Sequence, residues 1–365
     1  MPRSGVRSLV GYLRDRPIGI KLGFIMFVPT LAIVIVGANG LLGQISTTNN
    51  ADRARTLSTL TQFSGAFVDQ LQTERADATM LLGSTSGTAT TKAKATFVAQ
   101  TPLTDAAASA YTVQSDSQAH LPSNFQALLA QIQTQVGNLS GLRQEITSMN
   151  QIPLTIAVSQ YTALISSLLQ IRDDSAQLAG DSTISFEMRA AAAVASGKEY
   201  LSQERYLVLE AILQNSIPAD LRQQVIATQT GQDQAVTAFQ VVATPSQLAY
   251  YNLHVAGINL RPSTIAQNSL DQLQSDRLPA GLTADGWNTD MTQRSVLLRE
   301  VEQNIDSQTV ADATTLRDNV QKQIIIDVGL LFGMVLIAML IAWFVARSMN
   351  RSLRELKQGA LNVAQ

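Results

Sequence analysis

The chain has 365 residues, of which 45% are hydrophobic and only 15% are charged, and its formal net charge is −2. It contains no cysteine, which excludes disulfides, thiolate nucleophiles and cysteine-ligated metal sites. Its only histidines, His120 and His254, are far apart in sequence, so we expect no metal centre. The length allows two or three domains or one large one, and the apolar content suits either a packed core or a membrane segment.

The chain begins with a basic segment, residues 1–21, in which five arginines or lysines accompany a single acidic residue. Residues 22–43 follow without a charge, and a membrane-spanning helix needs about 20 apolar residues. A secretory signal peptide is the alternative, but its apolar region is shorter and no A-x-A cleavage site follows here. We therefore expect a transmembrane helix over 22–43.

A second apolar run covers residues 324–346 and is followed by the basic segment 347–365. Because positively charged flanks stay in the cytoplasm, both ends of the chain are predicted to be cytoplasmic and residues 44–323 extracytoplasmic. That segment carries 17 basic and 25 acidic residues, a net charge of −8. Asp327 lies near the start of the second run, where it either reaches the lipid headgroups or makes a polar contact in a dimer.

Residues 44–323 show no convincing alternation typical of strands, and Gln, Ala, Leu, Ser and Thr dominate them. The sequence therefore predicts an all-α fold, with antiparallel helices in one or two bundles. Two long helices, 44–82 and about 289–323, are expected to continue directly from the membrane segments. The predicted helix breaks are 83–91, Pro102, 120–124, 150–153, 178–183, 215–220, 244–246, 261–264 and 278–286.

Start signals accompany two of these breaks. Asp181, Ser182 and Thr183 precede one helical stretch, and Ser216 and Pro218 precede the next. Short polar side chains cap helix amino termini, and proline is tolerated in the first turn. The sequence therefore predicts helices that begin after each group.

Two short stretches, LQTER and LSQER, end at Arg75 and Arg205 and repeat the same Glu-Arg step. On each predicted helix the arginine lies at the edge of an apolar stripe, with Glu74 or Glu204 on the other side. A guanidinium is a planar fork of donors that matches a small oxyanion, so Arg75 and Arg205 are candidate ligand-binding residues. The alternative is that each arginine pairs with an acid on a neighbouring helix or extends to solvent.

The same stretches carry a family resemblance. LQTERADATMLL, then LR at 142–143, YTALISSLLQI at 161–171 and KEYLSQERYLVLEAI at 198–212 together resemble the NIT domain. This domain senses nitrate and nitrite outside the membrane in bacterial sensor proteins, including many actinobacterial sensor histidine kinases. The resemblance covers about residues 60–310 and implies an all-α fold of helical bundles. It also implies that Arg75 and Arg205 contact nitrate or nitrite, with Glu74 and Glu204 supporting them.

This sequence departs from the family beside each arginine. Ala76-Asp77 follows the first step and Tyr206 follows the second, where the family often has a small residue such as glycine. An additional acid and a bulky ring next to the arginines bear directly on anion binding.

Residues 347–365 place Leu353, Leu356, Ala360 and Val363 at helical spacing, a seam suited to a parallel dimeric coiled coil. The pattern resembles the first helix of a HAMP linker, with Ser352 in the position of the usual proline. We therefore expect a homodimer and read the chain as the amino-terminal part of a longer receptor. Otherwise the output domain is supplied separately or lost.

No catalytic or nucleotide-binding motif, histidine-kinase phosphoacceptor or cofactor signature is found, so we expect neither catalytic residues nor a cofactor in this chain. Basic residues do not cluster in 44–323, which argues against nucleic acid, and the basic ends suit anionic membrane lipid. The sequence thus predicts a receptor in the plasma membrane, the input half of a two-component sensor histidine kinase with a cytoplasmic response regulator as partner. The alternatives are a chemoreceptor or cyclase-type input, or a membrane-anchored helical scaffold with no small ligand.

Overall fold

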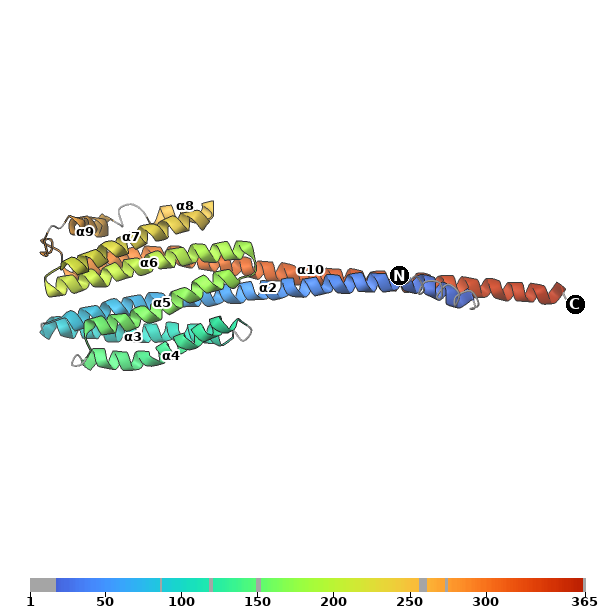
Figure 1. Cartoon of the computed structure of the whole chain (residues 1–365), viewed down its shortest axis with the longest axis horizontal. Coiled ribbons are helices and arrows are strands. Elements are labelled where there is room, and N and C mark those ends of the chain that lie inside the picture. Colours follow the sequence, from blue (N-terminus) through green and yellow to red (C-terminus); the bar gives the residue numbers. More distant parts are fainter. Residues whose placement is uncertain are drawn as a thin grey trace, which may run out of the picture. The chain divides into compact units, whose positions relative to one another are not determined.

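The computed structural model describes residues 18–363 except positions 86, 118–120, 149–151, 256–260 and 273–274 (Figure 1). Over these residues every regular element is an α-helix, which confirms the predicted all-α fold. The helices are α2 (Ile18–Gly83), α3 (Gly87–Asp116), α4 (Ser123–Ser148), α5 (Leu154–Leu178), α6 (Ser182–Gln214), α7 (Ala219–Val242), α8 (Pro245–His254), α9 (Arg261–Asp271) and α10 (Ala284–Val363).

The chain divides into two compact units. The first contains Met1–Asn49 and Arg317–Gln365, and the second contains Asn50–Leu316. The second unit holds the remainder of α2 and α10 and all of the shorter helices between them. Its bounds lie six and seven residues inside those of the segment 44–323, whose place outside the membrane stays a prediction.

Two apolar cores organise the second unit. The first is built mainly by α2, α3, α4 and α5, with large buried side chains such as Phe67, Phe97 and Phe125. The second is built mainly by α6, α7, α9 and α10 around Trp287 and Phe239. In Figure 1 the helices of the first core lie below those of the second. Of the two predicted arrangements, the unit therefore adopts two bundles.

Helix ends follow local chemistry where the sequence offered it. The Asp181 carboxylate accepts hydrogen bonds from the backbone N–H groups of Thr183 and Ile184, which confirms the predicted start of α6. Asn215 ends that helix in the left-handed region at φ 52°, which asparagine tolerates better than most residues. The predicted start near Ser216 and Pro218 is also observed, but Pro218 occupies the cap position and no side chain caps α7.

The predicted break at Pro102 is wrong, because Pro102 lies inside α3. A proline inside a helix removes one N–H donor and leaves the carbonyl four residues earlier without its usual partner. Here that carbonyl belongs to Val98, and the Thr101 hydroxyl donates to it at 3.0 Å. This substitute hydrogen bond removes one cost of continuing the helix.

The two predicted membrane segments both lie in continuous helices, 22–43 in α2 and 324–346 in α10. Among the described residues, two helices are long and apolar enough to cross a membrane, α5 and the stretch of α10 up to Val345. Much of α5 is buried in the first core, as a core helix of a folded domain is. In α10 most of the large apolar side chains between 325 and 344 are exposed, for example Phe332 at 69%. Membrane crossing itself stays a prediction.

Candidate functional site

The two Glu-Arg steps lie where the two cores meet, on α2 and α6. Glu74, Arg75 and Glu204 are fully buried, and Arg205 is 5% exposed. The sequence placed these residues at the edges of apolar stripes, and the structure buries all four. Four charged groups in such an interior need partners, since an unpaired buried charge is strongly unfavourable.

Glu74 turns into the first bundle. Its carboxylate accepts hydrogen bonds from Arg143 Nε at 2.7 Å and Nη2 at 2.9 Å, and from the Tyr161 hydroxyl at 2.6 Å. Burial, followed by the Glu74 charge, raises the pKa of Tyr161 well above its usual range, so its hydroxyl stays a donor. Arg143 is the arginine of the LR pair at 142–143, and the structure gives that pair a physical role.

Glu204 turns into the second bundle and is held by amides. The side-chain NH₂ groups of Gln229, Gln232 and Gln267 donate to its carboxylate at 3.1, 2.7 and 2.7 Å. Burial raises the pKa of Glu204, and these amide donors act against that rise. Each glutamate is therefore bound within its own bundle, and the supporting role predicted for Glu74 and Glu204 stays a prediction.

Arg75 faces α6 and is paired with an acid there. Its Nη1 and Nη2 donate to the Glu199 carboxylate at 2.9 and 3.0 Å, and also to Thr162 and Ser202 at 2.9 Å each. The Tyr206 ring lies with its centroid 4.9 Å from the guanidinium, a cation–π distance. The bulky residue after the second step therefore covers the arginine of the first. Arg75 matches the alternative in which the arginine binds a protein acid.

The positive charge of Arg205 is neutralised by protein groups much less completely than that of Arg75. Its Nε donates to Asn288 Oδ1 at 2.8 Å, and its backbone carbonyl accepts from Trp287 Nε1 at 3.0 Å. Within the described part of the chain no carboxylate forms an ion pair with it. Burial lowers the pKa of Arg205 to about 10, with the Asp77 charge acting against this and the Arg75 charge adding to it. The two arginines are thus close enough to influence each other, and Arg205 is the one whose charge lacks a close counter-ion.

Asp77 lies two residues after Arg75 and is only 6% exposed. Burial raises its pKa to about 6, while the Arg205 charge lowers it and the Glu74 charge raises it. No hydrogen bond or ion pair holds its carboxylate among the residues outside the gaps. This acid, close after the first Glu-Arg step, is therefore a buried neighbour of Arg205, the arginine without a close counter-ion.

Asp77 and Asn288 line the same cavity, of about 760 Å³, which we call the Asp77 cavity. Its walls come from α2, α3, the end of α6 and the start of α10. They carry apolar groups and hydroxyls, and also the exposed ion pair between Lys92 and Asp285, whose atoms are 2.7 Å apart. Since Asn288 binds Arg205, the inner wall of this cavity adjoins the arginine.

A cluster of six buried or partly buried charges lies further along the same helices. It comprises Asp69, Arg172, Lys198, Arg299, Glu302 and Asp306. Fully buried Glu302 is at its centre, 3.0 Å from Lys198 Nζ and from Arg299 Nη1 and 3.4 Å from Arg172 Nη1. Burial alone would raise the pKa of Glu302, but these three cations hold it well below its usual range. Gly65 leaves room for the cluster, since an added Cβ would lie 2.5 Å from Arg172 Nη1.

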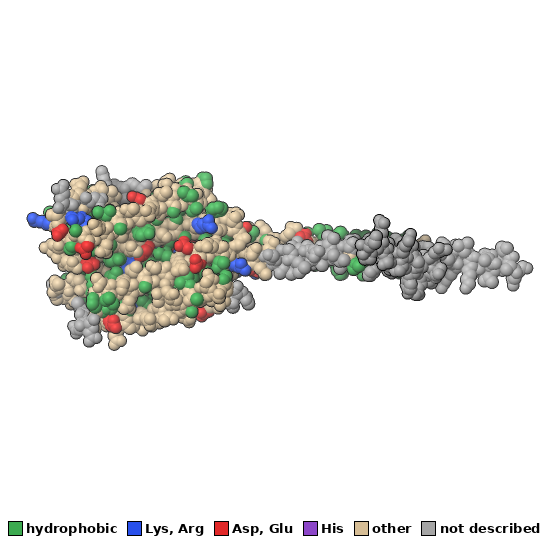
Figure 2. All heavy atoms as spheres, viewed as in Figure 1, with side chains coloured by type: hydrophobic (Ala, Val, Ile, Leu, Met, Phe, Trp, Pro, Cys, Tyr) green, Lys and Arg blue, Asp and Glu red, His purple; other side chains and the backbone are tan. Residues whose placement is uncertain are grey.

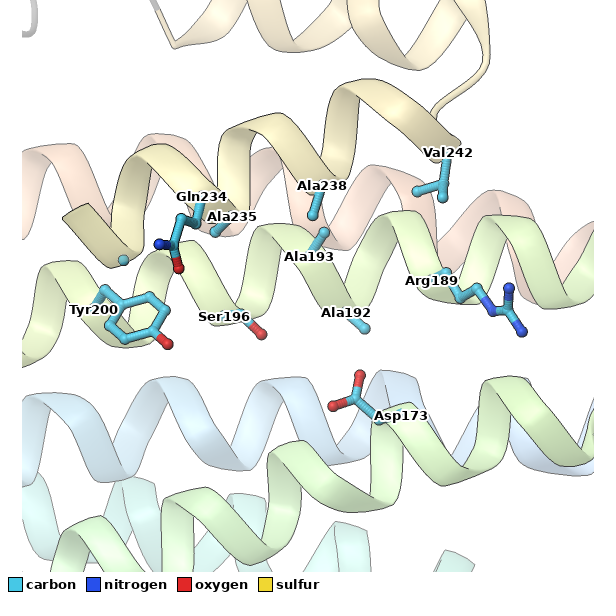
Figure 3. Close-up of a pocket in the computed structure, with 11 residues that line it drawn as sticks. Asp173, Arg189, Ala192, Ala193, Ser196, Tyr200, Gln234, Ala235, Ala238 and Val242 are labelled. Carbon is cyan, nitrogen blue, oxygen red and sulfur yellow. The ribbon is translucent and has the colours of Figure 1, made fainter. Parts of the chain in front are cut away.

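Two other hollows lie elsewhere in the second unit, and Arg75 and Arg205 line neither of them nor the Asp77 cavity. Figure 3 shows the larger, a groove of about 350 Å³ between α6 and α7 with a floor of alanines such as Ala192 and Ala238. Asp173 of α5 points toward this groove and Arg189 lies at one end of it. The smaller hollow, of about 220 Å³, lies beside α9 and the start of α10.

On the face of the second unit shown in Figure 2, basic and acidic side chains are few and scattered. A nucleic-acid interface concentrates lysines and arginines on one surface. No such concentration is seen on that face.

The sequence reasoning missed three groups that complete the site. Glu199, which pairs with Arg75, lies inside a quoted motif but received no role. Asn288 and Trp287, which hold Arg205, are more than 80 residues away in the chain. Lys198 lies near the apolar stripe of α6, but at 100° per residue Glu199 lies on nearly the opposite face, so helical periodicity gave no signal for it.

The fold and the site define a class of protein, an all-helical bundle domain with buried charged residues where its two cores meet. Comparison with known families gives the particular family. Residues 66–310 match the family model described as nitrate and nitrite sensing. The chain therefore belongs to the NIT family, which confirms the resemblance of its motifs.

A curated protein and a solved structure are similar to this chain. The "Nitrate regulatory protein" of Klebsiella oxytoca is 28% identical over 180 residues, which are 48% of this chain and 44% of that protein. The chain thus spans less than half the length of this curated relative. The "Structure of the NasR transcription antiterminator" has a TM-score of 0.69 and 22% identity, over 88% of this chain and 86% of that one. At this identity the likeness shows the fold alone.

Proposed function

We propose that the second unit binds nitrate or nitrite beside Arg205, with Arg75 as the second arginine of the site. The observation that carries this proposal is that the two buried arginines differ in how far protein groups neutralise their positive charge. Arg75 has a carboxylate at 2.9 Å, whereas Arg205 is 5% exposed and has only the Asn288 amide oxygen among its described polar side-chain partners. A buried guanidinium without a counter-ion is costly, and a bound planar anion supplies both the charge and matching acceptors.

The chain as a whole is proposed to be the input part of a membrane receptor. Support comes from the uncharged run 22–43, the exposed apolar surface of α10 between 325 and 344, and the basic flanks of both runs. With both ends cytoplasmic, the second unit lies outside the membrane, and the basic ends contact anionic inner-leaflet lipid. In this proposal residues 347–365 begin a HAMP-like linker, and the output is a histidine kinase acting on a response regulator.

Adjacent residues on α6 support a route from the site to α10. Glu199 pairs with Arg75, while Lys198 pairs with Glu302 of α10 at 3.0 Å. An anion that draws Arg75 away from Glu199 therefore acts on the turn of α6 that also holds α10. Because α10 continues into the second apolar run, a shift of this turn reaches the predicted membrane helix and the proposed homodimer seam.

A second candidate is a helical scaffold with no small ligand. The observation that favours it is the pairing of Arg75 with Glu199, because a site already filled by a protein carboxylate needs no added anion.

Titration calorimetry on the purified full chain in detergent separates the two candidates. Sodium nitrate and sodium nitrite are the ligands, and chloride and sulfate are the controls. Saturable nitrate or nitrite binding that Arg205→Gln abolishes supports the receptor. The matched control is Arg189→Gln, which removes an exposed arginine from the same helix and should leave binding unchanged. Absence of binding by folded protein at millimolar nitrate and nitrite would leave the scaffold as the better account.

A further inference from the structure

The Asp77 cavity gives the anion site a property that the family does not imply. We propose that Asp77 determines how strongly the site binds: an anion reaches Arg205 through the Asp77 cavity and binds together with one proton, which the Asp77 carboxylate takes up from solvent. This inference rests on the proposed function and specifies how that same site is regulated.

Position is the first argument. Asp77 and Asn288 both line the cavity, and Asn288 Oδ1 is the group that Arg205 Nε binds. Arg205 does not itself line the cavity, so an anion that approaches it by way of Asn288 enters a cavity that the Asp77 carboxylate also lines. Two negative charges beside one guanidinium repel each other, so an ionised Asp77 competes with the anion for the same cation.

The surroundings of Asp77 are the second argument. Arg205 of α6 is the cation that acts on it, and Glu74 of the same helix is the acid that acts on it. Lys92 of α3 and Asp285 of α10 are the charged groups that face the cavity from the other walls, and they neutralise each other in an exposed ion pair. The ionised Asp77 carboxylate is thus stabilised by a single nearby cation, Arg205. A bound anion would neutralise the Arg205 charge, which makes protonation of Asp77 favourable.

The raised pKa of Asp77 is the third argument, because it makes the uptake of a proton observable near neutral pH. Burial already places the pKa of Asp77 at about 6 in the protein without ligand. A second negative charge nearby raises it further, so that at pH 7.5 anion binding must draw a proton from solvent. Nitrate itself stays ionised throughout this range, which assigns any pH dependence to the protein.

The experiment measures nitrate affinity of the full chain in detergent at pH 5.5 and 7.5, at constant ionic strength. If only the protonated form of Asp77 admits the anion, affinity falls about 20-fold between these pH values. Asp77→Asn is uncharged at both, so it should bind equally well at both, about as tightly as the wild type at pH 5.5. The matched control is Glu187→Gln, which removes another carboxyl with a raised pKa, about 7, and should retain the 20-fold fall.

A second measurement needs no variant and so does not depend on whether Asp77→Asn folds. Titrating wild type with nitrate at pH 7.5 in two buffers of different ionisation enthalpy gives the number of protons taken up, which should approach one per anion. Nitrate binding with equal affinity at both pH values and no proton uptake would overturn the role of Asp77 while leaving the proposed function intact. An unchanged fall in Asp77→Asn would do the same. Binding of neither nitrate nor nitrite, in either protein at either pH, would remove the proposed function, and this inference with it.

Discussion

Replacing Glu302 by glutamine removes one charge from the centre of the buried cluster and leaves three cations facing two acids. Glu302 is fully buried and lies within 3.4 Å of Lys198, Arg172 and Arg299. Removing one partner of a buried ion pair costs about 3–5 kcal/mol, because the remaining charge is left uncompensated. For a unit of this size 1 kcal/mol corresponds to a few degrees, so the Tm should fall by about 10 °C. Thermal unfolding followed by circular dichroism measures this shift.

Two comparisons make the reasoning testable. Glu300→Gln removes an exposed carboxylate from the same helix two residues away and should change the Tm by less than about 2 °C. Because the folded-state pKa of Glu302 is depressed, its contribution is present above the unfolded-state pKa and is lost as pH falls through the folded-state value. The Tm difference between wild type and Glu302→Gln should therefore be constant near neutral pH and shrink below about pH 4. A variant as stable as wild type at pH 7 would refute the assignment of this cluster as a coupled set of buried charges.

Three further paired predictions concern single buried groups. Tyr161→Phe should lower the free energy of unfolding in urea by about 1–2 kcal/mol, because the carboxylate that accepts its hydrogen bond loses a donor. Tyr111→Phe should cost almost nothing, since its buried hydroxyl has no partner among the described residues, and equal losses in the two variants would contradict this. Gly65→Ala should lower the Tm by several degrees, because the new methyl group would lie 2.5 Å from charged side-chain atoms. Gly137→Ala places its methyl group in open space on a helix, so it should stabilise the chain by up to about 1 kcal/mol. Burial and an acidic neighbour raise the pKa of Glu187 to about 7, so its ionisation destabilises the folded state as pH rises from about 4.5 to 7. Glu187→Gln should therefore be more stable than wild type by about 1–2 kcal/mol at pH 8 but not at pH 4.5. Thermal melts of both proteins at the two pH values measure this difference.

Much of the fold was predictable because local chemistry decides where these helices begin and end. Asp181 is one example, since a short acidic side chain before an apolar stretch is strongly preferred as the N-cap of the helix that follows. Pro102 is the counter-example. Its break was predicted from the missing N–H, but the fold retained the helix because the preceding threonine hydroxyl satisfies the carbonyl that the proline leaves open.

The candidate site was predictable in its positions but not in its pairings. Helical periodicity was enough to place Arg75 and Arg205 near the core, since that depends on each helix alone. Partner choice depends on which side chains arrive from other helices. Glu199 comes from a helix more than 120 residues away in the chain, and Asn288 from one more than 80 residues away. No spacing within LQTER or LSQER carries that information.

The repeated Glu-Arg step has a physical logic once the two cores are known. At the boundary between two bundles, neighbouring positions on one helix face in different directions, so Glu74 and Glu204 each turn into their own bundle while Arg75 turns toward the other. The two steps are nevertheless unequal, because only Arg75 receives a carboxylate. Replacing buried charges by apolar groups is often neutral or favourable for stability, so stability alone gives no reason to bury Arg205 without a counter-ion. The proposed anion would supply the charge that Arg205 lacks, and its partner Asn288 lines the 760 Å³ cavity through which that anion would approach.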